Sequence, residues 1–321
     1  MGTGARIVGA CLALSLGACA HNAASTNDVS ENFCTTRVDR SVLPLALPAP
    51  GQAEGLVARG LNADRVETAE VIGALGALDA LVAAEDRGDG VAVLLARQLL
   101  HERVLLAMLD LQTANASLDC ENERGDRLRG QLQRVDARRT RNLGLAGVLI
   151  GATTAAVSGG LSLGAASTAS DIVGIVGGSA EAVAGGTVLF ATTSGTLRTQ
   201  TNLVEEVWRQ PGQSTLFPAT VWRYLTRRDE EGAANLADEI KAEWLAAGLI
   251  DDEDGLHALV LASEGIFTID DLERRDAMLL LIEARVTLLN RDLRLLLEAI
   301  VARPAPAVDA VRGPARGGRT R

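Results

Sequence analysis

The feature that most constrains the fold is a run of 29 residues without a charged side chain, from Asn142 to Ser170. As a helix, such a run is long enough to cross hydrocarbon of roughly 30 Å thickness. After Asp171, a second apolar run from Ile172 to Leu197 contains a single charged residue, Glu181. Two long apolar segments on either side of one acidic residue predict a helical hairpin over residues 142–197.

Small residues recur at helical spacing in this predicted hairpin. Such small-xxx-small faces let two helix backbones approach closely, above all in membranes. The glycines would weaken an isolated helix by about 1 kcal/mol each relative to alanine, so they imply close packing against another element. The predicted packing residues are Gly147, Gly151, Gly160, Gly164, Gly178, Ala182 and Gly186.

The apolarity of the hairpin is marginal for membrane insertion. Between Leu143 and Ala165 there are eight Leu, Ile or Val residues. Together they contribute on the order of −2 to −5 kcal/mol on the insertion scale, and the serines, threonines and glycines offset most of this. The hairpin can therefore pack in a helical bundle or contact lipid, and the sequence leaves both open.

The rest of the chain predicts an all-α fold, an elongated helical bundle with long amphipathic helices around the central Gly/Ala-rich hairpin. Hydrophobic residues make up 47% of the chain, only 8 residues are proline, and β-branched alternation is almost absent. One helix is expected from a cap at Asn62, with apolar residues at Val71, Leu75, Leu78 and Val82.

A second helix is expected from about Val91, with an apolar face formed by Leu95, Leu99, Leu106 and Leu109. The most regular helix is the last, whose apolar residues step by three and four and therefore predict packing along another long helix or a second copy of the chain. They are Leu279, Ile282, Val286, Leu289, Leu293, Leu296 and Ile300.

Seven arginines immediately precede the uncharged run. They can form a solvated helix face with ion pairs to Glu121, Asp126 and Asp136, or a cationic collar that meets lipid phosphates. They are Arg124, Arg127, Arg129, Arg134, Arg138, Arg139 and Arg141.

The N-terminus has the layout of a secretory signal peptide, with Arg6 followed by the uncharged segment Ile7 to Ala18. The four residues from Leu16 to Cys19 resemble the bacterial lipobox. That resemblance implies cleavage before Cys19 and its acylation, including by palmitate, and Ala20 implies sorting to the outer membrane. The alternative is an uncleaved or ordinary signal peptide with a chance cysteine.

The other cysteines fit an oxidising periplasm. After cleavage, Cys34 and Cys120 remain, and we expect them to form a disulfide; the alternative is two buried free thiols. The predicted organisation is a signal peptide over 1–18, a lipidated tether over 19–60, a helical domain over 61–303 and a disordered basic tail over 304–321.

Charge and aromatic content limit the partners. With 31 basic and 41 acidic residues the net charge is −10, which argues against general nucleic-acid binding because that needs a basic footprint. Aromatic residues are scarce, yet Phe217, Trp222 and Tyr224 lie within eight residues. They can form a ligand or partner pocket, sit at a membrane interface, or form a small core beneath a loop.

No catalytic pattern is present in the sequence. His21, His101 and His257 are widely separated, and GxxxxGK[ST], GxSxG and HExxH are missing. We expect no cofactor or metal. The predicted function is that of a non-catalytic lipoprotein anchored in the outer membrane through Cys19, facing the periplasm, that acts in assembly or membrane contact and associates with itself or a helical partner. The alternatives are an α-helical pore-forming protein, on architecture alone, and an enzyme without a recognisable motif.

Overall fold

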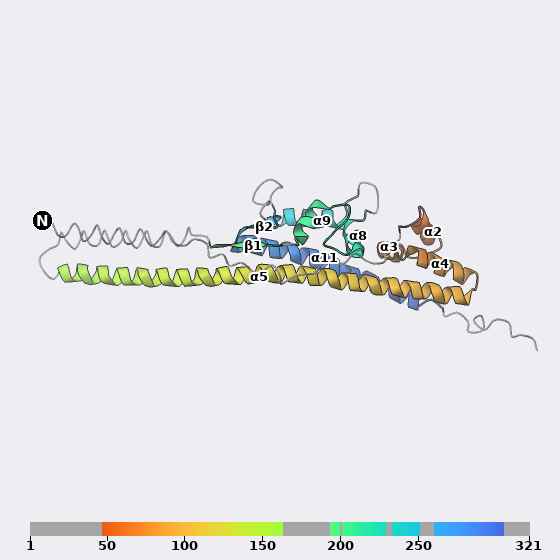
Figure 1. Cartoon of the computed structure of the whole chain (residues 1–321), viewed down its shortest axis with the longest axis horizontal. Coiled ribbons are helices and arrows are strands. Elements are labelled where there is room, and N and C mark those ends of the chain that lie inside the picture. Colours follow the sequence, from red (N-terminus) through yellow and green to blue (C-terminus); the bar gives the residue numbers. More distant parts are fainter. Residues whose placement is uncertain (1–46, 163–192, 200, 229–232, 251–259, 305–321) are drawn as a thin grey trace, which may run out of the picture. The chain divides into compact units, whose positions relative to one another are not determined.

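A computed structural model describes residues 47–162, 193–199, 201–228, 233–250 and 260–304, with side chains omitted at 143, 146, 147 and 149–162. The predicted all-α fold is confirmed, because the residues that the structure describes are mostly helical and contain one two-stranded sheet. In chain order (Figure 1), its elements are α2 Gln52–Ala58, α3 Ala63–Val71, α4 Leu75–Asp86, α5 Gly90–Ser162, β1 Ser194–Arg198, α7 Leu203–Arg209, α8 Ala219–Thr226, α9 Leu236–Ala246, β2 Glu264–Thr268 and α11 Ile269–Val301.

The chain divides into two compact units. Among the described residues, unit 1 comprises 124–162, 193–198 and 264–273, and unit 2 comprises 47–123, 199, 201–228, 233–250, 260–263 and 274–304. The helices α5 and α11 therefore contribute residues to both units.

The last helix has the apolar face that its sequence predicts. In α11, all seven residues of the three-and-four pattern are at most 2% exposed and belong to the core of unit 2. Its start is fixed by a reciprocal cap, in which the backbone N–H of Asp271 donates to the Thr268 hydroxyl over 3.2 Å and the N–H of Thr268 donates to the Asp271 carboxylate over 2.9 Å.

The helix expected from Asn62 is divided in two. Asn62 caps α3 as predicted, and its side chain accepts from the N–H of Arg65 over 3.3 Å. The helix then ends at Val71, because Gly73 adopts a φ of 68° and the N–H of Ala74 returns to the carbonyl of Ala69. The predicted tether also differs over its last residues, which form α2 with Leu56 fully buried.

Unit 1 contains the feature that the sequence did not predict, an antiparallel pairing of β1 with β2. Gly195 lies opposite Phe267 in this ladder, and Phe267 is fully buried. A Cβ at Gly195 would lie 3.0 Å from Cδ1 of Leu128 and 3.1 Å from Cδ2 of Leu132, so the approach of the strand to α5 favours glycine. The predicted helical hairpin over 142–197 therefore ends differently, as a strand, while α5 continues through residue 162 and 163–192 lie outside the described residues.

Unit 2 holds the larger core, and the tryptophans of the chain belong to it. Trp208 of α7 stacks on Trp244 of α9 with ring centroids 6.3 Å apart. Trp222 lies in α8 and is 5% exposed, whereas Trp244 is fully buried. Lys241 lies over the ring of Trp208, at 5.7 Å from its centroid, which adds a cation–π contact.

Candidate functional site

The predicted aromatic patch is divided between the core and a cavity. Phe217 and Trp222 stack with centroids 5.8 Å apart and are 2% and 5% exposed. The indole N–H of Trp222 donates to the carbonyl of Pro211 over 3.1 Å. These two rings therefore form part of the core beneath the 210–218 loop, and Tyr224 alone lines a cavity.

The cavity beside Tyr224 has a volume of about 260 Å³ and lies between α3, α8 and α11. A second cavity of about 640 Å³ adjoins it, because both are lined by Asn62 and Arg65. Charges of both signs line the two cavities, including Asp292 and Arg303. Nε of Arg303 donates to both carboxylate oxygens of Glu85, over 2.9 and 2.8 Å, so this cation is already neutralised.

The chemistry available in these cavities is limited. No serine, cysteine or histidine occurs among the residues that line them. The hydroxyl of Thr68 donates to the carbonyl of Asp64 over 2.8 Å and is therefore not paired with a base. Burial, with a smaller contribution from Asp292, raises the pKa of Tyr224 to about 12, so the phenol stays protonated at neutral pH.

The ionisation of Tyr224 can be measured directly because it is the only tyrosine in the chain. We expect tyrosinate absorbance to rise with a midpoint near pH 12 in the folded protein, against about 10 in denaturant. The folded-state pKa is the higher one. The resulting stabilisation is therefore fully present below pH 10 and is lost as the pH rises through 12. A folded-state midpoint equal to that in denaturant would contradict the burial of the phenol.

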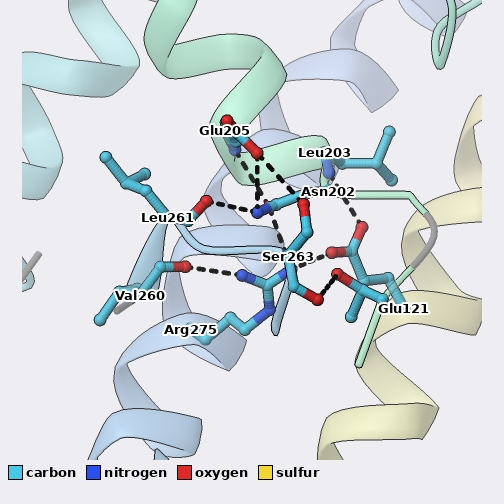
Figure 2. Close-up of polar contacts among 9 residues, drawn as sticks. Glu121, Asn202, Leu203, Glu205, Val260, Leu261, Ser263 and Arg275 are labelled. Atoms are coloured by element: carbon cyan, nitrogen blue, oxygen red, sulfur yellow. Dashed lines mark hydrogen bonds and ion pairs between the residues drawn. The ribbon is translucent and has the colours of Figure 1, made fainter. Parts of the chain in front are cut away.

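A buried polar cluster lies elsewhere in unit 2, and Figure 2 shows its contacts. Its centre is an ion pair between Glu121 of α5 and Arg275 of α11, whose side chains are 1% and 3% exposed. The guanidinium also donates to the carbonyl of Val260 over 2.7 Å and to the side-chain oxygen of Asn202 over 3.1 Å. The second carboxylate oxygen of Glu121 accepts from the N–H of Leu203 over 3.0 Å.

Asn202 connects this cluster to the start of α7. Its side-chain oxygen caps that helix by accepting from the N–H of Glu205 over 3.2 Å, and its amide donates to the carbonyl of Leu261 over 2.5 Å. Ser263 closes the cluster, because its carbonyl accepts from the N–H of Thr199 over 2.7 Å. The buried polar cluster thus fixes α5, the start of α7 and α11 to one another, and neither charge lines either cavity.

The predicted arginine row is only partly paired as expected. Arg129 forms an ion pair with Asp126. Glu121 pairs with Arg275, and Asp136 accepts from the hydroxyl of Thr193 over 3.1 Å. The remaining side chains of the row differ in exposure, and those that the structure leaves exposed include Arg134, Arg138 and Arg141.

Several predicted sites lie wholly or partly outside the described residues. Cys120 lies half-buried on α5 and is disulfide-bonded, whereas Cys34 and the lipidation residue Cys19 are not described, so the pairing of Cys34 with Cys120 stays a prediction. Gly147, Gly151 and Gly160 belong to α5. The other small residues of the predicted hairpin face are outside the described ranges, namely Gly164, Gly178, Ala182 and Gly186.

The apolar face predicted for the second helix is wrong. Leu95, Leu99, Leu106 and Leu109 are 63%, 52%, 38% and 50% exposed. The core of unit 2 instead takes the opposite face of α5, where all the residues are at most 4% exposed: Val93, Ala96, Leu100, Val104, Ala107, Leu111, Ala114 and Leu118. This helix therefore has two apolar faces, one buried and one exposed.

Metal sites and membrane spans are considered within the described ranges alone. These ranges contain no group of three or more His, Cys, Asp or Glu side chains arranged to hold a metal ion. None of their helices combines the length and the hydropathy needed to cross a membrane. No family model, curated protein or solved structure matches the chain.

Proposed function

We propose that this chain is a non-catalytic, lipid-anchored helical protein of the outer membrane that acts in assembly or membrane contact through its glycine-rich segment. The anchor in this proposal is acylated Cys19, and several acyl chains hold a protein firmly because each buried methylene contributes about 0.8 kcal/mol. The protein faces the periplasm, where a disulfide between Cys34 and Cys120 is stable.

The observation that carries the proposal is the continuity of α5. This helix runs for 73 residues, and its Arg124–Ser162 part leads from the arginine row into the uncharged run without a break. Beyond the last arginine, Leu145 and Val148 are 58% and 70% exposed. Exposed apolar residues next to exposed arginines suit a helix that meets another helix or the edge of a lipid layer.

The buried polar cluster and the cavities support a non-catalytic role. Arg275 and Glu121 use their polar atoms to join elements of the fold. The cavities beside Tyr224 have balanced charges and no nucleophile paired with a base. An enzyme built on a carboxylate pair is the competing proposal, and Asp64, Glu67 and Asp292 are the carboxylates at the cavity beside Tyr224.

The function can be tested with glycine variants of the hairpin in a chain carrying Cys19→Ser, so that acylation does not dominate binding. Gly151→Leu and Gly186→Leu add apolar area but block close helix contact. We expect both variants to form smaller oligomers than the parent, because only contacts through the hairpin are blocked, while binding liposomes at least as well as the parent. Sizing by light scattering and co-sedimentation with liposomes measure the two effects separately.

Gly125→Leu is the matched control, because nothing lies within 4 Å of a Cβ built at Gly125 and the residue precedes the uncharged run. Release of a small dye from the liposomes by the parent would favour the pore-forming alternative over an assembly protein. Variants at Gly151 and Gly186 that change neither oligomerisation nor lipid binding would exclude a role for the glycine face.

A further inference from the structure

We propose that a second copy of this chain docks antiparallel on the exposed apolar face of α5. The two-fold axis crosses this face at the level of residue 100 along the helix. We call this face the α5 stripe and define it by Val91, Leu94, Leu95, Leu105, Leu106 and Leu109, which are between 38% and 63% exposed. The proposal does not depend on the glycine-rich hairpin or on lipid anchoring, because every residue of the stripe belongs to unit 2.

The α5 stripe lies opposite the core. At 3.6 residues per turn, Val91 and Leu109 fall on one line along the helix, and Leu94, Leu95, Leu105 and Leu106 flank that line. Leu100 and Leu111, which are 0% and 1% exposed, lie on the far side of the helix. The stripe extends over about 27 Å at 1.5 Å per residue. An exposed apolar surface of this size, with two polar residues only at its middle, marks an interaction surface.

The order of residues in the stripe identifies the partner. Val91, Leu94 and Leu95 precede Leu100 by nine, six and five positions, and Leu109, Leu106 and Leu105 follow it by the same numbers. In an antiparallel pair centred on residue 100, each of these side chains therefore meets a large apolar side chain of the other copy. Such self-complementarity is what a two-fold interface requires, because the same patch serves both subunits.

Two polar residues at the middle of the stripe support this register. Gln98 and Glu102 lie two positions on either side of Leu100, and the Gln98 amide donates to the Glu102 carboxylate over 2.9 Å within one helix. In the antiparallel pair, each Gln98 also faces Glu102 of the second copy. A polar layer within an apolar seam fixes register and orientation. An ionised carboxylate on the midline also disfavours burial of the same face in lipid.

The test is a charge exchange across the proposed interface, measured by sedimentation velocity on the full chain carrying Cys19→Ser. We expect the parent to form a concentration-dependent dimer. Leu95→Glu or Leu105→Lys alone should weaken that dimer at least tenfold, because each places a charge opposite leucine. The double variant should restore it, since each introduced carboxylate then faces an introduced ammonium group of the other copy.

The rescue cannot arise within one copy, because residues 95 and 105 are about 15 Å apart along the helix. Leu280→Glu is the matched control, as Leu280 is 49% exposed on α11 and lies outside the stripe; it should leave the dimer unchanged. Circular dichroism checks that each variant keeps its helical content.

Three results would overturn the proposal. A parent that stays monomeric at all concentrations would mean that no second copy occupies the stripe, whether or not residues 1–46 of the same chain cover it. A dimer that persists in Leu95→Glu would place the contact elsewhere. A double variant as dissociated as the single variants would exclude the antiparallel register centred on Leu100.

Discussion

Replacement of Arg275 by methionine is expected to lower the free energy of unfolding by about 3–5 kcal/mol, the usual effect of removing one partner of a buried ion pair. The variant removes the cation of a buried ion pair, in which Glu121 is 2% exposed. It also removes the donors to the carbonyl of Val260 and to Asn202, the residue that caps α7. Chemical denaturation followed by circular dichroism measures the change.

The control for this prediction is Arg285→Met. Arg285 pairs with Glu243, but these side chains are 29% and 38% exposed, so their interaction contributes only about 0–1 kcal/mol. Arg275→Met combined with Glu121→Met should be less destabilised than Arg275→Met alone, because the buried ion pair is then removed as a whole. Equal losses for Arg275→Met and Arg285→Met would show that burial of the Glu121–Arg275 pair has no energetic consequence.

The second large effect concerns the two faces of α5. Leu100→Ala should lower the free energy of unfolding by about 2–5 kcal/mol, through lost burial and the cavity that the smaller side chain leaves. Leu100 is fully buried. Leu99→Ala should change stability by less than about 0.5 kcal/mol, because Leu99 is 52% exposed. Thermal denaturation at a concentration where the chain is monomeric compares these neighbouring positions.

The variants at Leu99 and Leu100 also test which face of α5 forms the core, the one in the structure or the one predicted from the sequence. If the face with Leu95 and Leu99 formed the core, the larger loss would occur at position 99. The measured order of the two variants therefore decides which side of α5 packs against the rest of unit 2.

The sequence predicted best what depends on local periodicity. In α11 the seven residues that step by three and four lie on one helical face, and Leu279 and Ile300 near its ends are both 2% exposed. Other leucines of α11, such as Leu280 at 49% exposed, fall outside that stepping pattern. The cap at Asn62 could also be predicted from the sequence. An asparagine before a helix accepts a hydrogen bond from the free backbone N–H three residues later, here that of Arg65.

Periodicity failed in α5 because two of its faces are apolar. Leu95 and Leu99 fit one helical face, and Leu100 and Leu111 fit the opposite one, so hydrophobicity alone could not distinguish the two. The choice between them is made by packing against helices distant in sequence, which a single helical pattern does not report.

The strand pair and the buried polar cluster could not be predicted because they depend on contacts between residues distant in sequence. The strand pair joins Ser194 to Thr268, and neither five-residue strand has a strong alternating pattern. Glu121 and Arg275 are separated by 154 positions, and each occurs among other charged residues in its helix. The buried polar cluster therefore left no signal in the sequence, although Asn202 could have been identified as a helix cap from its place before Leu203 and Glu205.

The positions of the tryptophans allow the unfolding of unit 2 to be followed separately in solution. The chain has three, and Trp208, Trp222 and Trp244 come from α7, α8 and α9, all within unit 2. Tryptophan fluorescence is therefore a spectroscopic reporter of that unit alone and carries no emission from the β1–β2 ladder of unit 1. Far-ultraviolet dichroism sums the helices of both units, so a difference between the two melting curves would resolve the unfolding of one unit from that of the other.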